Sequence, residues 1–267
     1  MKDGRGVVTV VQARTGSTRL PGKVLLTACG EPLLLLMLER LARAKRAGTV
    51  VVATTKLPED DAIEALAGRC GVPCFRGSTE DLLDRHLGAA REFGARYVVK
   101  VPSDCPLVDP AIVDRVLGIF LAAADRFDYV SNLHPMTWPD GMDVEVMTLD
   151  ALETASGASW RKHEREHTTP YLWEKAGRFR TANVVWETGR DLSKTVRLTI
   201  DYAEDYELIR AVFEALRPAK PDFGLEDVLA WLEAHPEVAS RNAAHRGVTW
   251  YTRHLADARL ASGAGAP

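Results

Sequence analysis

The chain has 267 residues, of which 46% are hydrophobic and 27% are charged, and its formal net charge is -3 at pH 7. This composition is that of an ordinary globular protein and excludes disordered and fibrous classes. A small negative charge gives no basic field for a phosphate backbone, so we expect no nucleic-acid partner. The longest apolar run, Leu33 to Leu38, is too short to cross a bilayer, so we expect no membrane association and a cytoplasmic location.

The N-terminal part of the chain alternates between strand and helix patterns. Val7 to Val11 is a continuous β-branched run, which is typical of a strand buried on both faces of a parallel sheet. After a glycine-containing loop, the pattern predicts a helix over Pro32 to Ala47 and a second strand over Val50 to Ala53. This order of strand, loop, helix and strand indicates an α/β fold.

The same alternation continues through the middle of the chain. It predicts helices over Pro58 to Arg69, Ser78 to Phe93 and Ala111 to Ala124, and strands over Pro73 to Phe75, Tyr97 to Val101 and Tyr129 to Ser131. From Leu133 to Arg190 the rhythm changes and tryptophans accumulate, which we interpret as an inserted lobe. Alternation over Thr195 to Ile200 predicts another strand, and a helix is expected over Ala203 to Leu216.

We therefore predict a mostly parallel, doubly wound, Rossmann-like α/β sheet with helices on both faces. The main domain is expected over residues 1–217 and includes an inserted α/β lobe at residues 133–190. Residues 218–267 are expected to form a C-terminal helical extension.

The loop from Gln12 to Lys23 has the composition of a polyphosphate site. It follows the first strand, and ligands bind at the carboxyl ends of strands in open α/β sheets. Gly16 lets backbone N–H groups approach phosphate oxygens, while Arg14, Arg19 and Lys23 can offset their charge. The loop is not a Walker A loop, because Val24 replaces the magnesium-binding hydroxyl residue. The alternative is an exposed basic turn without a ligand.

Two carboxylates are predicted to meet at the same edge of the sheet. Asp104 follows the strand over residues 97–101, and Asp201 ends the strand expected over residues 195–200. Mg²⁺ is commonly held by one or two carboxylates together with phosphate oxygens and water. The pair thus predicts a magnesium site opposite the basic loop, and the alternative is that both residues cap helices or turns.

Several short strings, taken together, resemble one known family. They are Gln12-Ala13-Arg14 through Pro21-Gly22-Lys23, Val51 to Asp61, Ser103-Asp104-Cys105-Pro106-Leu107, Asp143-Val144-Glu145-Val146, Arg165-Glu166-His167-Thr168-Thr169-Pro170 and Thr199-Ile200-Asp201. In order and separation they resemble nucleotidyltransferases of the spore-coat-polysaccharide-biosynthesis and acylneuraminate/Kdo cytidylyltransferase type. The resemblance covers nearly the whole chain.

This resemblance implies a cytidylyltransferase that moves CMP from CTP to an acidic sugar or a related small acceptor and releases pyrophosphate. It implies a magnesium-dependent, in-line attack on the α-phosphorus, in which the protein mainly positions groups and neutralises charge. Arg14, Lys23, Asp104 and Asp201 are the implied catalytic residues, and the two aspartates are the implied metal ligands. A homodimer formed through the inserted lobe is also implied.

The remaining candidate residues divide between nucleotide and acceptor. For the nucleotide they are Gln12, Ala13, Arg14, Gly16, Ser17, Arg19, Lys23, Ala53, Thr54, Thr55, Arg76 and Ser103. For the acceptor they are Gly141, Asp143, Glu145, Arg165, Glu166, His167 and Thr168, with Lys162 and Arg165 as candidates to hold a substrate carboxylate. A solvent-facing strand edge around Asp143 and a solvated charged helix face around Arg165 are the alternatives.

Two rival activities have some support in the sequence. His163-Glu164-Arg165-Glu166-His167 matches the HExxH pattern of zinc hydrolases, but the stretch lacks an apolar face and Pro170 follows at once. A glycosyltransferase that uses a nucleotide sugar would share the fold and a metal carboxylate. The basic Arg14 to Lys23 loop and the lack of a DxD string at a strand end disfavour it. A catalytically silent binding protein is a third alternative.

Overall fold

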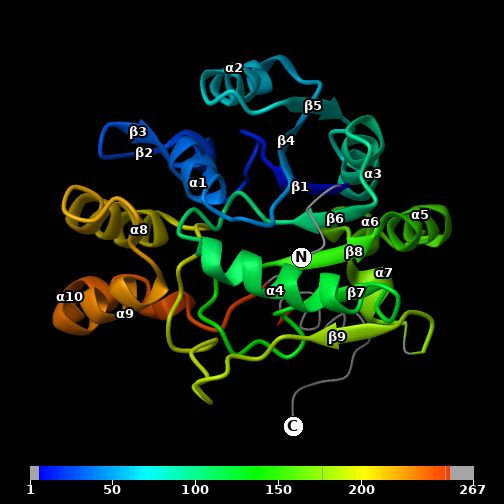
Figure 1. Ribbon diagram of the computed structural model, residues 1–267. Coiled ribbons are helices and arrows are strands. Elements are labelled where there is room, and N and C mark those ends of the chain that lie inside the picture. The colour runs from blue at the N-terminus through cyan, green and yellow to red at the C-terminus, as the bar shows by residue number, and fades with distance from the viewer. Residues whose placement is uncertain (1–5, 176, 250, 253–267) are drawn as a thin grey trace, which may run out of the picture.

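The computed structural model describes residues 6–175, 177–249 and 251–252. A seven-stranded sheet with the order β5-β4-β1-β6-β8-β7-β9 forms its centre (Figure 1). Its strands are β1 (Val7–Gln12), β4 (Thr49–Thr55), β5 (Cys74–Gly77), β6 (Tyr97–Lys100), β7 (Tyr129–Ser131), β8 (Glu145–Thr148) and β9 (Thr181–Asn183). Only β8 runs against its neighbours, so the sheet is mostly parallel, as predicted. A separate hairpin pairs β2 (Thr27–Ala28) with β3 (Glu31–Pro32).

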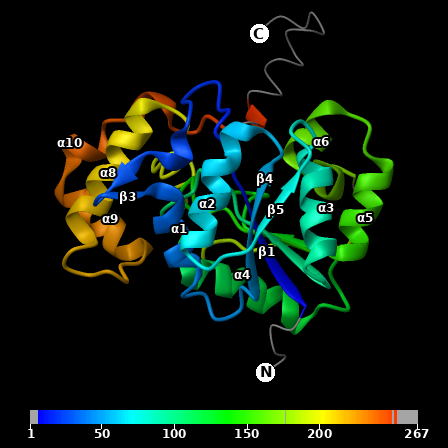
Figure 2. The same ribbon diagram turned by 90° about the horizontal axis from the view of Figure 1, so that it is seen from above.

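Helices cover both faces of this sheet and a further group lies beside it (Figure 2). The α-helices are α1 (Leu33–Leu41), α2 (Asp61–Arg69), α3 (Leu82–Glu92), α4 (Pro110–Ala122), α5 (Leu149–Ala158), α6 (Lys162–His167), α7 (Pro170–Trp173), α8 (Ala203–Leu216), α9 (Leu225–Ala234) and α10 (Pro236–Ala239). Short 3₁₀ turns occur at η1 (Lys23–Leu25), η2 (Pro58–Asp60) and η3 (Ala243–His245). Among the described residues, no helix has the length and apolar character needed to span a membrane.

The valine-rich sequence of β1 explains its central place. Successive side chains of a strand point to opposite faces, so Val7 and Val11 pack into one core cluster while Val8 and Val10 pack into the other. All four are at most 2% exposed. Burial of one such side chain contributes about 1.5–3 kcal/mol, so both faces of β1 stabilise the fold. Its carboxyl end, which leads into the basic loop, is thereby held in place.

Most helix predictions are confirmed, with shorter bounds. The helix expected over residues 32–47 ends at Leu41 and continues as turns, and the one expected from Ser78 begins at Leu82, where Asp81 caps α3 by accepting from Asp84 N–H at 2.9 Å. The inserted lobe is predicted over residues 133–190. This segment contributes β8 and β9 to the main sheet, and it also contains α5, α6 and α7.

The prediction of a strand over Thr195 to Ile200 is wrong. The segment begins in a turn at Thr195 and forms only a single bridge, between Arg197 and Asp140. Its backbone groups are satisfied elsewhere, because Leu198 N–H donates to the Asp140 carbonyl at 2.6 Å and Ile200 N–H donates to the Asp104 carbonyl at 2.8 Å. The alternating pattern therefore reflects burial against these loops, without a partner strand.

The C-terminal helices are joined to the main domain by buried polar groups. Asp109 caps α4 by accepting from Ala111 N–H at 2.8 Å, and its other oxygen accepts from Leu225 N–H at 2.6 Å at the start of α9. Arg40 donates to the carbonyls of Val108 and Phe223, each at 3.0 Å. Figure 1 shows α8, α9 and α10 grouped on the side of the sheet away from α3 and α5.

His86 gives the fold a predicted pH dependence. Its ring is fully buried in α3, where Nδ1 donates to the Leu82 carbonyl at 2.9 Å, and burial lowers the pKa of His86 to about 3. The unfolded chain takes up a proton near pH 6.5 while the folded chain does not, so stability falls as pH drops from about 6.5 towards 3.

In His86→Gln we expect the free energy of unfolding to decrease less steeply as the pH falls, by about 1.4 kcal/mol per pH unit, because unfolding no longer takes up one proton. Urea unfolding between pH 6 and pH 4 measures this slope. His235→Gln is the matched control, because His235 contacts the Trp231 carbonyl at 2.8 Å in the same way but is not fully buried. Equal slopes for the wild type and His86→Gln would contradict the prediction.

Candidate active site

The basic loop after β1 is fixed by a buried carboxylate that the sequence did not reveal. Asp60 Oδ1 accepts from both the N–H and the hydroxyl of Thr15 at 2.8 Å, and its second oxygen accepts from the Thr55 hydroxyl. Burial opposes ionisation of Asp60, but the hydrogen bonds from Thr55 and Thr15 hold its pKa below the usual value. An ionised Asp60 at η2 therefore anchors the first turn of the loop.

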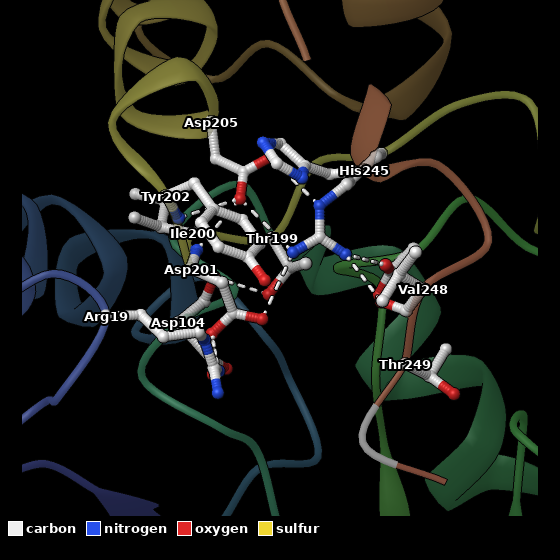
Figure 3. Close-up of polar contacts among 12 residues, drawn as sticks. Arg19, Asp104, Thr199, Ile200, Asp201, Tyr202, Asp205, His245, Val248 and Thr249 are labelled. Carbon is white, nitrogen blue, oxygen red and sulfur yellow. Dashed lines mark hydrogen bonds and ion pairs between the residues drawn. The ribbon is translucent and has the colours of Figure 1, made fainter. Parts of the chain in front are cut away.

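Lys23, at the end of that loop, is surrounded by three oxygens. Its Nζ lies 3.2 Å from Asp104 Oδ2, 3.0 Å from Asp201 Oδ1 and 2.6 Å from the Ile200 carbonyl. Arg19 also forms an ion pair with Asp201 (Figure 3). Burial tends to lower the pKa of Lys23, but Asp104 and Asp201 raise it above the usual value. Two of the three predicted cations, Lys23 and Arg19, therefore meet the predicted carboxylates at one point, while Arg14 lines the neighbouring cavity.

Backbone hydrogen bonds bring the two aspartates together. Asp104 lies in the turn after β6, and its carbonyl accepts from Ile200 N–H at 2.8 Å and from the Thr199 hydroxyl at 3.0 Å. Burial opposes ionisation of Asp201, but Lys23 and Arg19 hold its pKa well below the usual range. Both carboxylates are thus placed by their own backbones, independently of the ion pairs.

Arg197 forms a second, buried centre of charge behind Asp201. Its guanidinium lies 3.1 Å from Asp201 Oδ2, 2.7 Å from Asp140 Oδ2 and 2.9 Å from Asp205 Oδ1, and its side chain is 1% exposed. Despite burial, these hydrogen bonds and charges raise the pKa of Arg197. Burial and repulsion from Asp143 raise the pKa of Asp140, while the ion pair with Arg197 opposes this shift. Arg197 is therefore a fixed positive charge to which three aspartates are paired.

Two adjoining cavities open at this cluster. The larger, of about 960 Å³, is lined by residues of the basic loop, the N-terminal end of α3 and α6. It contains these predicted site residues: Gln12, Ala13, Arg14, Ser17, Arg19, Lys23, Ser103, Asp104, Arg165, Glu166 and His167. The smaller, of about 240 Å³, contains Asp143, Glu145 and Asp201. Both are lined by Gln12, Arg19, Leu82, Asp104 and His167, so they meet beside the Lys23 cluster.

Some predicted site residues line neither cavity, and their roles stay predictions. They are Gly16, Ala53, Thr54, Thr55, Arg76, Gly141 and Thr168. Arg76 donates to the Thr55 carbonyl at 2.9 Å and pairs with Asp61 and Glu64. Gly141 has φ +105°, and a Cβ there would lie 2.5 Å from the Leu198 backbone. Glycine is therefore required for the close approach of these two segments of the chain.

The sequence reasoning missed several residues of this site. Arg85 lines the larger cavity from α3 and is 3% exposed, but a single arginine in a helix pattern carries no distinguishing signal. Arg197 stands in an alternating segment, where a charged residue is expected to face solvent. The C-terminal residues Val248, Thr249 and Tyr251, which line the smaller cavity, lie far from any recognised string.

The HExxH string, His163 to His167, forms a short helix whose glutamate has a structural role, unlike the catalytic glutamate of a zinc hydrolase. Glu164 is 0% exposed, and its Oε2 accepts from the N–H groups of Trp160 and Arg161, at 3.3 and 3.2 Å, as the cap of α6. His163 contacts Glu174 at 3.2 Å, and ligand atoms of His163, Glu164 and Glu174 lie within 4.8 Å of one another. In an HExxH site both histidines bind zinc and the glutamate is the base, but His167 is not part of this group and Glu164 caps the helix, so this geometry disfavours the hydrolase alternative.

A family model described as "Cytidylyltransferase" matches residues 8–224. The chain belongs to this cytidylyltransferase family. This chain is 29% identical to the spore coat polysaccharide biosynthesis protein SpsF of Bacillus subtilis, over 89% of this chain and 98% of that protein. It is 35% identical to 3-deoxy-manno-octulosonate cytidylyltransferase of Geobacter sulfurreducens over 42% of this chain and 44% of that protein.

A solved structure supports the same membership. The chain is similar to a cytidylyltransferase from Leptospira borgpetersenii serovar Hardjo-bovis, with a TM-score of 0.83 and 36% identity over 91% of this chain and 98% of that one. The predicted family, the α/β nucleotidyltransferase fold and the enzyme class are thereby confirmed. This cytidylyltransferase therefore places its Lys23 cluster in a fold shared with its relatives.

The Asp60 anchor can be tested in this cytidylyltransferase. We expect Asp60→Ala to weaken CTP binding at least about 10-fold, because two hydrogen bonds to a charged group are lost and the basic loop is no longer held. Equilibrium dialysis with labelled CTP and Mg²⁺ measures the affinity. Glu59→Ala is the matched control, since this neighbouring carboxylate is exposed. Equal affinities for the two variants would show that Asp60 does not position the loop.

Proposed function

We propose that this cytidylyltransferase transfers CMP from CTP to a hydroxyl of an acidic sugar or related small acceptor and releases pyrophosphate. The observation that carries the proposal is the position of Lys23 Nζ, which joins Asp104 and Asp201 where the two cavities meet. The larger cavity suits the nucleotide and the smaller one suits the acceptor. A relative named 3-deoxy-manno-octulosonate cytidylyltransferase supports an acidic sugar as the acceptor.

The larger cavity has the charge that a triphosphate requires. Arg14, Arg19, Lys23 and Arg85 all line it. Burial and repulsion from Arg14 lower the pKa of Arg85 only to about 10, so its guanidinium stays protonated near neutral pH. Positively charged groups fixed around developing negative charge act without reorganisation during the reaction. These four side chains would bind the phosphates and stabilise the leaving pyrophosphate.

The residues at the border of the cavities fit a magnesium ion. Asp104, Asp201 and the Ile200 carbonyl offer only oxygen atoms, and in this structure they surround the ammonium group of Lys23. Oxygen ligands with room for phosphate and water are what Mg²⁺ requires. When bound to Asp104 and Asp201, the ion would supply charge neutralisation at the α-phosphate. Lys23 would then be free to contact a phosphate oxygen.

The reaction requires an in-line arrangement of acceptor, α-phosphorus and pyrophosphate. The acceptor oxygen forms a new bond to the α-phosphorus, the bond to the bridging oxygen breaks, and its electron pair leaves with the pyrophosphate. The acceptor hydroxyl passes its proton to water in the same step. Arg14, Arg19 and Lys23 would orient the triphosphate from the larger cavity, while the smaller cavity holds the acceptor on the opposite side of the phosphorus. No covalent bond to the protein is needed.

The acidic group of the acceptor would face α6. Lys162 has an 87% exposed side chain and lines the larger cavity, where its partner Glu166 lies 3.4 Å away. Arg165 is already engaged, because it forms an ion pair with Asp81 and donates to the Ser156 carbonyl at 2.7 Å. Lys162 is therefore the better candidate for a substrate carboxylate, and Arg165 would fix α6 against α3.

A homodimer through residues 133–190 is part of the proposal. This segment carries two of the large exposed apolar side chains among the described residues, Trp160 at 80% exposure and Val185 at 50%. Large exposed apolar side chains often mark protein contacts. Analytical ultracentrifugation of the wild type and of Trp160→Glu tests this, and a monomeric wild type would contradict it.

The reaction is tested by pyrophosphate release with CTP, ATP, GTP or UTP, a panel of acidic and neutral sugars, and Mg²⁺ or EDTA. We expect turnover only with CTP, Mg²⁺ and an acidic sugar. Lys23→Ala or Asp104→Ala should lower it at least about 10²-fold, the usual loss for a charge-stabilising group.

Lys56→Ala, which changes an exposed lysine outside both cavities, is the matched control and should keep wild-type turnover. If Asp104→Ala keeps normal turnover, while His163→Ala loses turnover and added zinc restores it, the protein is a zinc hydrolase and this proposal is wrong. Sugar transfer from a nucleotide sugar without pyrophosphate release would replace it by the glycosyltransferase.

A further inference from the structure

We propose that residues 246–249 and 251–252 close the smaller cavity around an uncharged, polyhydroxylated part of the acceptor, and that Tyr251 determines which acceptors fit. This inference rests on the proposed function, because it assigns the smaller cavity to the acceptor. It goes further by naming the wall of that cavity, the chemistry that the wall selects, and the residues that hold it in place.

The C-terminal segment is fastened to the part of the chain that carries Asp201. Arg197 Nη1 donates to the Val248 carbonyl at 3.1 Å while its other nitrogens bind Asp201 and Asp205. Asn242, which is 1% exposed, donates to the Arg197 carbonyl at 3.0 Å and to Asp205 Oδ1 at 2.9 Å. One guanidinium thus positions both a predicted metal ligand and the segment that ends at the cavity.

Aromatic rings connect this segment to the opposite wall. Tyr251 meets Trp173 edge to face, with ring centroids 5.2 Å apart, and Trp173 stacks on His134 at 3.9 Å. All three residues line the smaller cavity. Rigid aromatic faces supply much of the apolar contact in small-molecule sites, and a few polar groups then fix the orientation of the ligand. The apolar C–H faces of a sugar chain suit such a wall.

The polar lining of the smaller cavity is acidic and its cations are already paired. Lys100 forms an ion pair with Glu145, Arg19 pairs with Asp201, and Arg197 pairs with three aspartates. Asp140 and Asp143 also line the cavity. Carboxylate oxygens accept hydrogen bonds from hydroxyl groups and repel a second carboxylate. The cavity thus suits a hydroxyl-rich, uncharged part, and the acidic group of the acceptor would remain in the larger cavity near Lys162.

The segment lies beyond residues 8–224, which match the family model. The carboxylates and cations that would handle the nucleotide all lie within that range. The wall that closes the acceptor cavity therefore comes from a different part of the chain than the reaction centre does. Changes in this segment can alter acceptor choice while leaving the nucleotide site intact, which makes the two roles experimentally separable.

Tyr251→Ala tests the wall directly. We expect it to lower kcat/KM for the best acceptor of the sugar panel at least about 10-fold, the loss typical when a pocket contact is removed. The dissociation constant for CTP with Mg²⁺, from equilibrium dialysis, should stay within about twofold, since no residue of the larger cavity changes. Tyr206→Ala is the matched control, because this tyrosine is partly buried like Tyr251 and lines neither cavity.

A second readout needs no known acceptor. Water can attack CTP through an opened cavity, so CMP release from CTP and Mg²⁺ without sugar should rise several-fold in Tyr251→Ala and not in Tyr206→Ala. Asn242→Ala, which loosens the segment without changing the lining, should shift both readouts in the same direction as Tyr251→Ala. Its melting temperature separates this effect from unfolding.

The outcomes distinguish the two proposals. A wild type that does not bind CTP with Mg²⁺ contradicts the proposed function and this inference with it. A wild type that binds CTP and transfers CMP, with Tyr251→Ala matching Tyr206→Ala in both readouts, overturns this inference alone. Weaker CTP binding in Tyr251→Ala, in parallel with weaker acceptor use, also overturns it, because the segment would then support the whole site.

Discussion

A continuous set of ion pairs determines how this cytidylyltransferase is organised. Lys23 and Arg19 contact Asp201 from the solvent side, and Arg197 contacts it from the interior. Arg197 also pairs with Asp140 and Asp205, so loops at the edge of the sheet and the first turn of α8 share one charge network. Removing one partner of a buried pair typically costs about 3–5 kcal/mol, because the other charge is left without compensation. The network therefore ties the reaction centre to the stability of the fold.

The parts of this arrangement that the sequence predicted are those that depend on local pattern. Valine runs revealed β1, the basic loop stood out by its cations, and Asp104 was recognisable because it follows a buried strand. A parallel sheet brings the carboxyl ends of its strands to one edge, so the meeting of that loop with Asp104 could be expected. Asp201 does not follow a strand. It is placed at this edge because Ile200 N–H and the Thr199 hydroxyl donate to the Asp104 carbonyl.

The parts that could not be predicted depend on contacts between distant segments. Asp60 looks like an acidic residue at the start of a helix, and only its bonds to Thr15 show that it anchors the loop. Arg197 occupies an alternating segment, and its burial is possible only because three aspartates come from elsewhere. The C-terminal wall carries no motif at all, since a backbone carbonyl such as that of Val248 makes its contact regardless of the side chain.

We propose that Asp104 and Asp201 hold the metal that accompanies CTP. The most direct test is a crystal structure of the protein with CTP and Mn²⁺, in which anomalous scattering locates the ion. The account predicts one strong peak within about 2.5 Å of oxygens from both aspartates and in contact with the nucleotide phosphates. A peak at His163 and Glu174 with none beside Asp104, or CTP bound away from Lys23, would contradict it.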